Sequence, residues 1–148
     1  MNTLAKDEPH KVYGDYAQLI AKASTIRTYQ IADYPVVSPE QLPNIPYIYD
    51  YEIERIYEHD KSSASSFTEH LLDTNQYIFG NQRMCPFVGR YAVEFIKGKF
   101  NLTILFSDKA CSKIIIFCPG TPIDKKHIDL GENSQIYSAL IPLVTDKK

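Results

Sequence analysis

Three cysteines are the residues of this chain with the widest chemical repertoire. Cys85, Cys111 and Cys118 show no C-x-x-C spacing, and their odd number argues against a complete disulfide framework. A free cysteine in a globular domain is most often a buried, reduced thiol. We therefore expect buried thiols here, and the alternatives are a Cys85–Cys111 bridge or a pair of metal ligands.

The four histidines form no recognisable metal motif. His10, His59, His70 and His127 are scattered, without H-x-x-x-H or H-E-x-x-H spacing. Catalytic zinc needs three convergent protein ligands. A thiol–imidazole dyad would need an activated Cys85, and no helix N-terminus is predicted beside this residue. We therefore expect no catalytic residue, no metal and no cofactor.

Charge is distributed unevenly along the chain. The net charge of −2 implies neither a nucleic-acid partner nor a membrane partner. Residues 1–74 contain 12 acidic and 6 basic residues, whereas residues 75–148 contain 6 acidic and 10 basic residues. This split predicts opposed surface potentials on the folded protein.

The acidic residues concentrate in residues 50–60, beside a row of tyrosines. Tyrosine is enriched at protein interfaces because its ring offers apolar area and its hydroxyl group offers a hydrogen bond. We predict a surface that binds a basic protein; the alternative is a solvated strand face with a tyrosine-rich core side. The predicted binding residues are Tyr47, Tyr49, Asp50, Tyr51, Glu52, Glu54, Glu58 and Asp60.

A β-meander is the structural element that the sequence indicates most clearly. Residues 91–96, 102–107 and 114–118 are three runs rich in Val, Ile and Phe, separated by short turn-forming segments. Short turns between such runs predict antiparallel pairing. The last two runs are apolar on both faces, so we expect helices on one side of the sheet and loops or a partner on the other.

Two more strands are predicted, at residues 26–32 and 47–57. Alternation along the second places its odd-numbered residues, from Tyr47 to Tyr57, on one face. Residues 34–46 contain four prolines and predict a long surface connection.

Three helices complete the prediction. They lie at residues 15–25, at residues 61–73 with a capping box from Ser66 to Glu69, and after Asn133 or Ser134. Residues 74–85 and 123–131 are interpreted as loops. The expected fold is α+β, with an antiparallel sheet of about five strands, helices mainly on one face, and the order α-β-β-α-β-β-β-α.

Several short segments of the chain form a recognisable series: residues 26–31, Tyr51-Glu52-Ile53, Leu71-Leu72-Asp73, Tyr77, Cys85, residues 92–95, and residues 102–106 with Cys111. In this series the chain resembles a family of small, uncharacterised bacterial α+β proteins with a Cys-containing β-meander. The resemblance covers residues 15 to 120 and implies fold more than function. The C-F-x-C pair of that family is incomplete here, because Leu105-Phe106-Ser107 occupies the place of its first cysteine.

The length predicts a single domain over residues 1–148, with residues 1–12 flexible. The polar N-terminus lacks the apolar core of a signal peptide, and no apolar run is long enough to span a bilayer. We therefore expect a cytoplasmic protein without a membrane partner.

Two functions fit these observations. The first is a non-catalytic protein-binding domain with an acidic, tyrosine-rich docking surface, for which a bacterial immunity protein that inhibits a toxin is a fitting example. The alternative is a small enzyme or ligand-binding domain with a pocket near Cys85, under residues 34–46 and lined by Tyr47, Tyr49 and Phe95.

Overall fold

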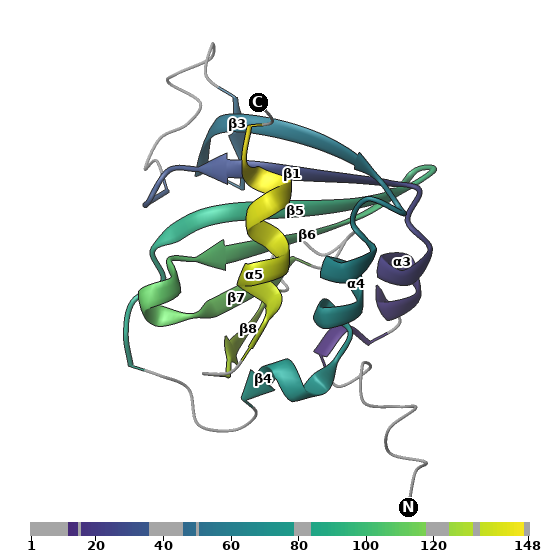
Figure 1. Ribbon diagram of the computed structural model, residues 1–148. Helices are drawn as coiled ribbons and strands as arrows, with labels where there is room; N and C mark the ends of the chain where they lie inside the picture. Colours follow the sequence, from purple (N-terminus) through teal and green to yellow (C-terminus); the bar gives the residue numbers. More distant parts are fainter. Residues whose placement is uncertain are drawn as a thin grey trace, which may run out of the picture.

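An antiparallel β-sheet dominates the computed structural model, which describes residues 12–14, 16–35, 46–49, 51–78, 84–117, 125–131 and 134–146 (Figure 1). The strands are β1 (Thr25–Ile31), β2 (Tyr47–Ile48), β3 (Tyr51–Asp60), β4 (Tyr77–Ile78), β5 (Gly89–Lys97), β6 (Phe100–Ser107), β7 (Lys113–Phe117) and β8 (Lys125–Leu130). Within the described chain they form one eight-stranded sheet in the order β2-β3-β1-β5-β6-β7-β8-β4. The predicted flexibility of residues 1–12 concerns a segment that, except for Val12, lies outside the described residues.

The helices are short and lie on one face of this sheet (Figure 1). The α+β class and the placement of helices on one face are therefore confirmed. In the described chain, no helix is long and apolar enough to cross a bilayer. The helices are α3 (Tyr16–Lys22), α4 (Ser65–Leu71) and α5 (Ile136–Leu140), with the 3₁₀ turns η2 (Thr74–Gln76), η3 (Lys109–Cys111) and η4 (Ile141–Val144).

The sheet has more strands than the sequence indicates. The predicted meander is present as β5, β6 and β7, and residues 26–32 form β1 as expected. Residues 123–131, predicted to be a loop, contain β8, and β8 pairs with both β7 and β4. Among the residues of β8 only Ile128 and Leu130 are apolar, and both are buried. Because the composition of this segment is otherwise polar, its pairing with neighbouring strands decides its conformation.

The main core lies between the sheet and the helices. Phe67 of α4 packs against Phe95 of β5 and Phe106 of β6, with ring centroids 6.4 and 5.9 Å away. All three rings are almost completely buried. Ile136 and Leu140 of α5 join the same cluster, as their spacing predicts.

A second, smaller core covers part of the opposite face. Ala92, Leu105 and Ile115 come from the three central strands and are buried there. Because both faces of β5, β6 and β7 are covered, the prediction from their two-sided apolar pattern is confirmed. The buried residues of this second core are Tyr29, Ile31, Tyr51, Ala92, Leu105, Ile115 and Phe117.

Residues 47–57 do not form the single strand that their sequence predicts. Tyr49 has a φ of +47°, which places it in a turn between β2 and β3. A shift of register opposite Gln30 and Ile31 then reverses the facing of the later residues. Tyr51 lies in the second core, whereas Tyr57 lies on the helix side and bonds to Asp146. The expected row of tyrosines on one face is therefore wrong.

The predicted capping box of α4 is also wrong. The helix begins after Ala64, which makes no side-chain cap, so Ser66 lies inside the helix. Asp60, at the end of β3, instead accepts hydrogen bonds from the Ser62 hydroxyl and the Ser63 amide, at 3.0 and 2.8 Å. These bonds to the charged form lower the pKa of Asp60.

Gly89 lies where β5 passes closest to the ends of β1 and β3. Its amide donates a 2.7 Å hydrogen bond to the Asp33 carbonyl. A Cβ atom at this position would lie 2.8 Å from the Ala32 carbonyl oxygen and 2.8 Å from the Tyr51 ring. A glycine is thus required by close packing.

We expect Gly89→Ala to lower the free energy of unfolding by about 1–3 kcal/mol, because the added methyl group must displace backbone. Gly131→Ala is the matched control, since its Cβ would lie 3.6 Å from its nearest neighbour, an ordinary contact. Urea denaturation of both variants measures the difference. Equal stabilities would contradict the close approach at Gly89.

Candidate functional site

The predicted binding tyrosines have different environments. Tyr49 has 42% of its surface exposed, and its ring stacks on Phe117 of β7 with centroids 3.8 Å apart. Tyr51 is buried and packs edge-on against Phe87, so its ring is unavailable to a partner. The Tyr47 side chain lies outside the described residues. Among the tyrosine rings that the structure describes in this set, Tyr49 alone is exposed.

Four of the predicted acidic residues lie on β3, in the outer part of the sheet. Glu54, Glu58 and Asp60 are exposed, and Glu52 is half-buried. Asp50 lies outside the described residues. The structure thus brings four of the predicted carboxylates onto one strand.

A row of charged groups crosses from β3 to β5 on the face opposite the helices. Arg27 Nε lies 3.1 Å from Glu58 Oε2, and Arg27 Nη1 lies 3.9 Å from Glu94 Oε1. The Tyr29 hydroxyl donates a 2.8 Å hydrogen bond to Glu94. Burial, and this bond to a carboxylate, raise the pKa of Tyr29 to about 12. Glu94 is half-buried and is paired with Arg27.

The helix side of β3 is tied to the C-terminal segment. Arg55 Nη1 lies 2.6 Å from Asp146 Oδ2, and the Tyr57 hydroxyl donates a 2.8 Å hydrogen bond to Asp146 Oδ1. His59 Nε2 lies 2.8 Å from the Leu143 carbonyl oxygen. Because Asp146 neutralises Arg55, the cation on β3 does not cancel the acidic residues of the strand.

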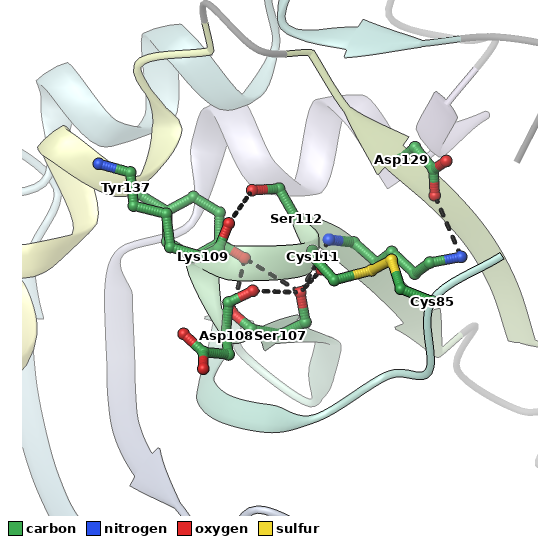
Figure 2. Close-up of a disulfide and its surroundings, with 9 residues drawn as sticks. Cys85, Ser107, Asp108, Lys109, Cys111, Ser112, Asp129 and Tyr137 are labelled. Atoms are coloured by element: carbon green, nitrogen blue, oxygen red, sulfur yellow. Dashed lines mark hydrogen bonds and ion pairs between the residues drawn. A yellow bond between two sulfur atoms is a disulfide. The ribbon is translucent and has the colours of Figure 1, made fainter. Parts of the chain in front are cut away.

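A disulfide joins Cys85 to Cys111, with Cα atoms 6.2 Å apart, a usual separation for a bridge (Figure 2). It connects the segment before β5 to η3, between β6 and β7. The expectation of reduced thiols is therefore wrong for this pair, and the bridge that the sequence left open is present. The spacing of the cysteines in the sequence could not distinguish a bridge from reduced thiols, because Cys85 and Cys111 are 26 residues apart. Cys118 lies outside the described residues.

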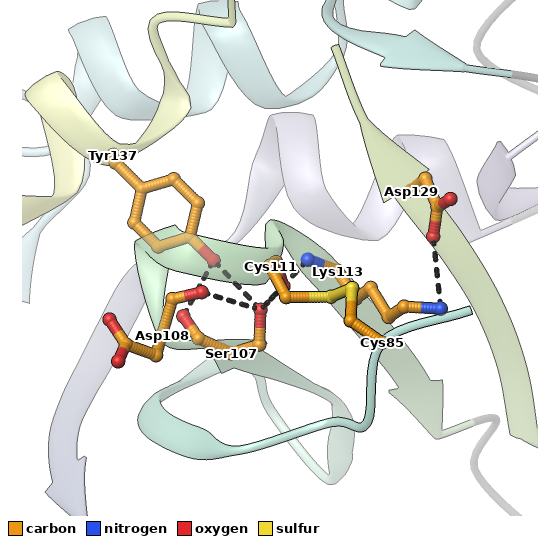
Figure 3. Close-up of polar contacts among 7 residues, drawn as sticks. All are labelled: Cys85, Ser107, Asp108, Cys111, Lys113, Asp129 and Tyr137. Atoms are coloured by element: carbon orange, nitrogen blue, oxygen red, sulfur yellow. Dashed lines mark hydrogen bonds and ion pairs between the residues drawn. A yellow bond between two sulfur atoms is a disulfide. The ribbon is translucent and has the colours of Figure 1, made fainter. Parts of the chain in front are cut away.

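Hydrogen bonds to Ser107 hold η3 beside the bridge (Figure 3). The Ser107 hydroxyl donates to the Cys111 carbonyl at 2.5 Å and accepts from the Lys113 amide at 2.8 Å. The Tyr137 hydroxyl of α5 donates a 2.6 Å bond to the Ser107 carbonyl. Burial raises the pKa of Tyr137 to about 12, so it stays a neutral donor at physiological pH. These bonds hold η3 and α5 against the end of β6.

A buried ion pair lies next to the disulfide. Lys113 Nζ is 3.4 Å from Asp129 Oδ1, and the side chains are 12% and 2% exposed (Figure 3). The sequence does not single out Asp129 as a buried residue, because residues 123–131 have the composition of a polar loop. An acidic residue between Ile128 and Leu130 was the available signal for a strand with a buried carboxylate.

A small cavity lies between the start of β5, η3 and α5. Its volume is about 150 Å³, and Arg90 Nη2 lies 3.7 Å from Asp108 Oδ2 at its wall. The predicted pocket near Cys85 is not assembled from the residues named for it, because Phe95 is buried on the helix side of the sheet, whereas Tyr49 lies on the opposite face. The cavity is lined by Arg90, Tyr91, Asp108, Lys109, Tyr137, Ser138 and Ile141.

Within the described residues, no three His, Cys, Asp or Glu side chains converge in a way that could hold a metal ion. His59 lies on β3 and His70 lies on α4.

We expect reduction of the Cys85–Cys111 bridge, or the variant Cys85→Ser/Cys111→Ser, to lower the free energy of unfolding by about 3–4 kcal/mol. The reason is that a cross-link over 26 residues restricts the unfolded chain. Denaturation with and without dithiothreitol measures this loss. A linked Cys85–Cys111 peptide in a non-reduced digest confirms the pairing, and unchanged stability on reduction would contradict it.

We expect Lys113→Met to destabilise the fold by about 3–5 kcal/mol, because it removes the ammonium group that pairs with the buried Asp129 carboxylate. The double variant Lys113→Met/Asp129→Leu should recover part of this loss, since no charge is then buried. Thermal denaturation of the two single variants and the double variant forms a complete cycle. Strictly additive effects would show that the two groups do not interact.

Comparisons with known proteins supply no relative from which a function could be taken. No protein-family model, no curated protein and no solved structure matches this chain. The resemblance to small bacterial proteins with a Cys-containing meander therefore stays a prediction. The function has to be argued from the geometry described above.

Proposed function

We propose that this chain is a non-catalytic protein-binding domain that docks a basic protein through the acidic surface of β3. The observation that carries this proposal is the row of exposed carboxylates of Glu54, Glu58 and Asp60 on one strand. On the outer side of β3, β2 pairs with Tyr51 and Glu52, and no described strand pairs with residues 54–60, so this part of the strand is accessible to a partner.

Electrostatics favour a basic partner. Two nearby cations are already engaged, because Arg27 pairs with Glu58 and Glu94, and Arg55 pairs with Asp146. The remaining negative charge attracts positively charged surfaces, accelerates encounter and disfavours acidic competitors. Tyr49 is exposed and stacks on Phe117 of β7, so the aromatic contact that it can offer a partner lies over β7 rather than beside Glu54, Glu58 and Asp60.

An immunity-type inhibitor of a bacterial toxin is the specific form of this proposal. Such a protein needs a stable, rigid scaffold and a charged docking surface, and it needs no catalytic group of its own. The sheet, with a core on each face, supplies the scaffold. The acidic residues of β3 supply the surface.

The disulfide bears on the compartment in which this binding takes place. Structural disulfides are rare in reducing compartments. The cytoplasmic location predicted from the sequence therefore requires that the Cys85–Cys111 bridge persists against cellular thiols. An oxidising compartment imposes no such requirement, and it is the location that we favour.

The alternative function, a small enzyme or ligand-binding domain, would use the cavity beside η3. At about 150 Å³ this cavity is smaller than the roughly 300–1,000 Å³ typical of small-molecule sites. Its wall contains Lys109 and the Arg90–Asp108 ion pair, so a polar molecule of a few atoms is the ligand class that fits. The cavity supports a function less strongly than the surface of β3 does, because β3 offers more accessible groups.

The test is a charge reversal on β3. We expect Glu54→Lys to weaken capture of the cognate partner from an extract of the source cells by about tenfold, since attraction becomes repulsion. Glu52→Lys/Glu54→Lys should abolish it. Glu54 is suitable because it is exposed, whereas Glu58 and Asp60 also make contacts within the fold.

Glu69→Lys is the matched control, because Glu69 is an exposed glutamate on α4, away from β3. This variant changes the net charge by the same amount as Glu54→Lys does. It should capture the partner as well as the parent chain does. Circular dichroism confirms that all variants are folded. Equal capture by the Glu52→Lys/Glu54→Lys variant would remove the acidic surface from the proposed function.

A further inference from the structure

We infer that β3 binds its partner by strand addition: an extended basic segment of the partner pairs with the outer edge of β3 and continues the sheet. This inference rests on the proposed function and specifies how the docking takes place. It adds main-chain hydrogen bonds to the electrostatic attraction described above.

The first observation is the length of β3 that lacks a neighbouring strand. On its inner side β3 pairs with β1 from Ile53 to Asp60. On its outer side the two-residue strand β2 pairs only with Tyr51 and Glu52, and the Ile53 amide donates to the Pro46 carbonyl. Among the described residues, none pairs with the outer edge at residues 54–60. Every second residue there directs its N–H and C=O groups outward, as on any edge strand.

The second observation is the rigidity of this edge. β1 pairs with β3 from one side, and Asp146 and the Leu143 carbonyl hold Arg55, Tyr57 and His59 from the helix side. Arg27 fixes Glu58 on the opposite face. A strand that is held in place before binding pays little ordering entropy when a partner pairs with it.

The side chains of β3 define the segment that fits. Ile56 and Glu58 occupy the face opposite the helices, because their partners Tyr29 and Arg27 lie there, and alternation places Asp60 with them. Ile56 is 56% exposed. The fitting segment thus carries an apolar residue opposite Ile56 and basic residues at the following alternate positions.

A second copy of this chain fits the edge poorly. Antiparallel pairing of two β3 strands centred on Ile56 sets Glu54 of one copy opposite Glu58 of the other. Like charges directly opposite each other destabilise a strand pair. The same carboxylates that discourage self-association select a basic strand, so the edge discriminates between partners.

The experiment uses the full chain and a synthetic probe. The probe is a capped seven-residue peptide with one valine and two lysines at alternate positions, separated by threonines. Two analogues are N-methylated, one on the odd-numbered amides and one on the even-numbered amides. Since only one set of amides faces β3, strand addition predicts that one analogue binds about tenfold more weakly and the other binds nearly as well as the parent peptide.

Hydrogen exchange and one matched pair of variants locate the contact. Binding of the parent peptide should slow amide exchange in residues 54–60. Ile56→Lys should weaken binding about tenfold, since it adds a like charge at the centre of the edge. Ile78→Lys is the control, because Ile78 is an exposed isoleucine on β4, the opposite edge strand.

The outcomes separate this inference from the proposed function. If both N-methylated analogues bind as tightly as the parent peptide, the contact is electrostatic, strand addition is wrong and acidic docking stands. If no lysine peptide binds but the cognate partner is captured in a Glu54-dependent manner, strand addition is again wrong. If capture is also independent of Glu54, the proposed function fails as well.

Discussion

Burial of both faces of the central strands is the constraint on which the structure depends. β5, β6 and β7 carry large apolar side chains in both directions, and each face loses hydrophobic stabilisation if it remains in water. The helices α3, α4 and α5 can cover only one face. The second face must be covered by what the sheet and its connections supply.

That second cover explains several features that look unrelated. The β2–β3 turn brings Tyr49 onto Phe117, although β1, β5 and β6 lie between β3 and β7 in the sheet. The Tyr49 backbone accepts a positive φ, a conformation that tyrosine rarely adopts, and stacking offsets this cost. Phe87 covers Tyr51, and the nearby disulfide anchors the segment that carries Phe87. Gly89 is required at the place where these segments meet most closely.

The same arrangement determines which groups are available for function. Two carboxylates that sequence alone would treat alike have different roles. Asp129 is buried against Lys113 and is part of the scaffold, whereas Glu54 is exposed on the border strand. In the described part of the chain, β2 pairs with only Tyr51 and Glu52 on the outer side of β3.

The sequence by itself determined the fold class, the central meander, β1, and the apolar sides of α5. These depend on periodicity within one element, where each residue's environment follows from its neighbours in the chain. Tertiary structure alone decided the facing of Tyr51 relative to Tyr57, the strand at residues 125–130, the Cys85–Cys111 bridge and the Lys113–Asp129 pair. Each of these depends on a partner distant in sequence. A bulge that reverses a face, or a neighbouring strand that recruits a polar segment, leaves little trace in local composition.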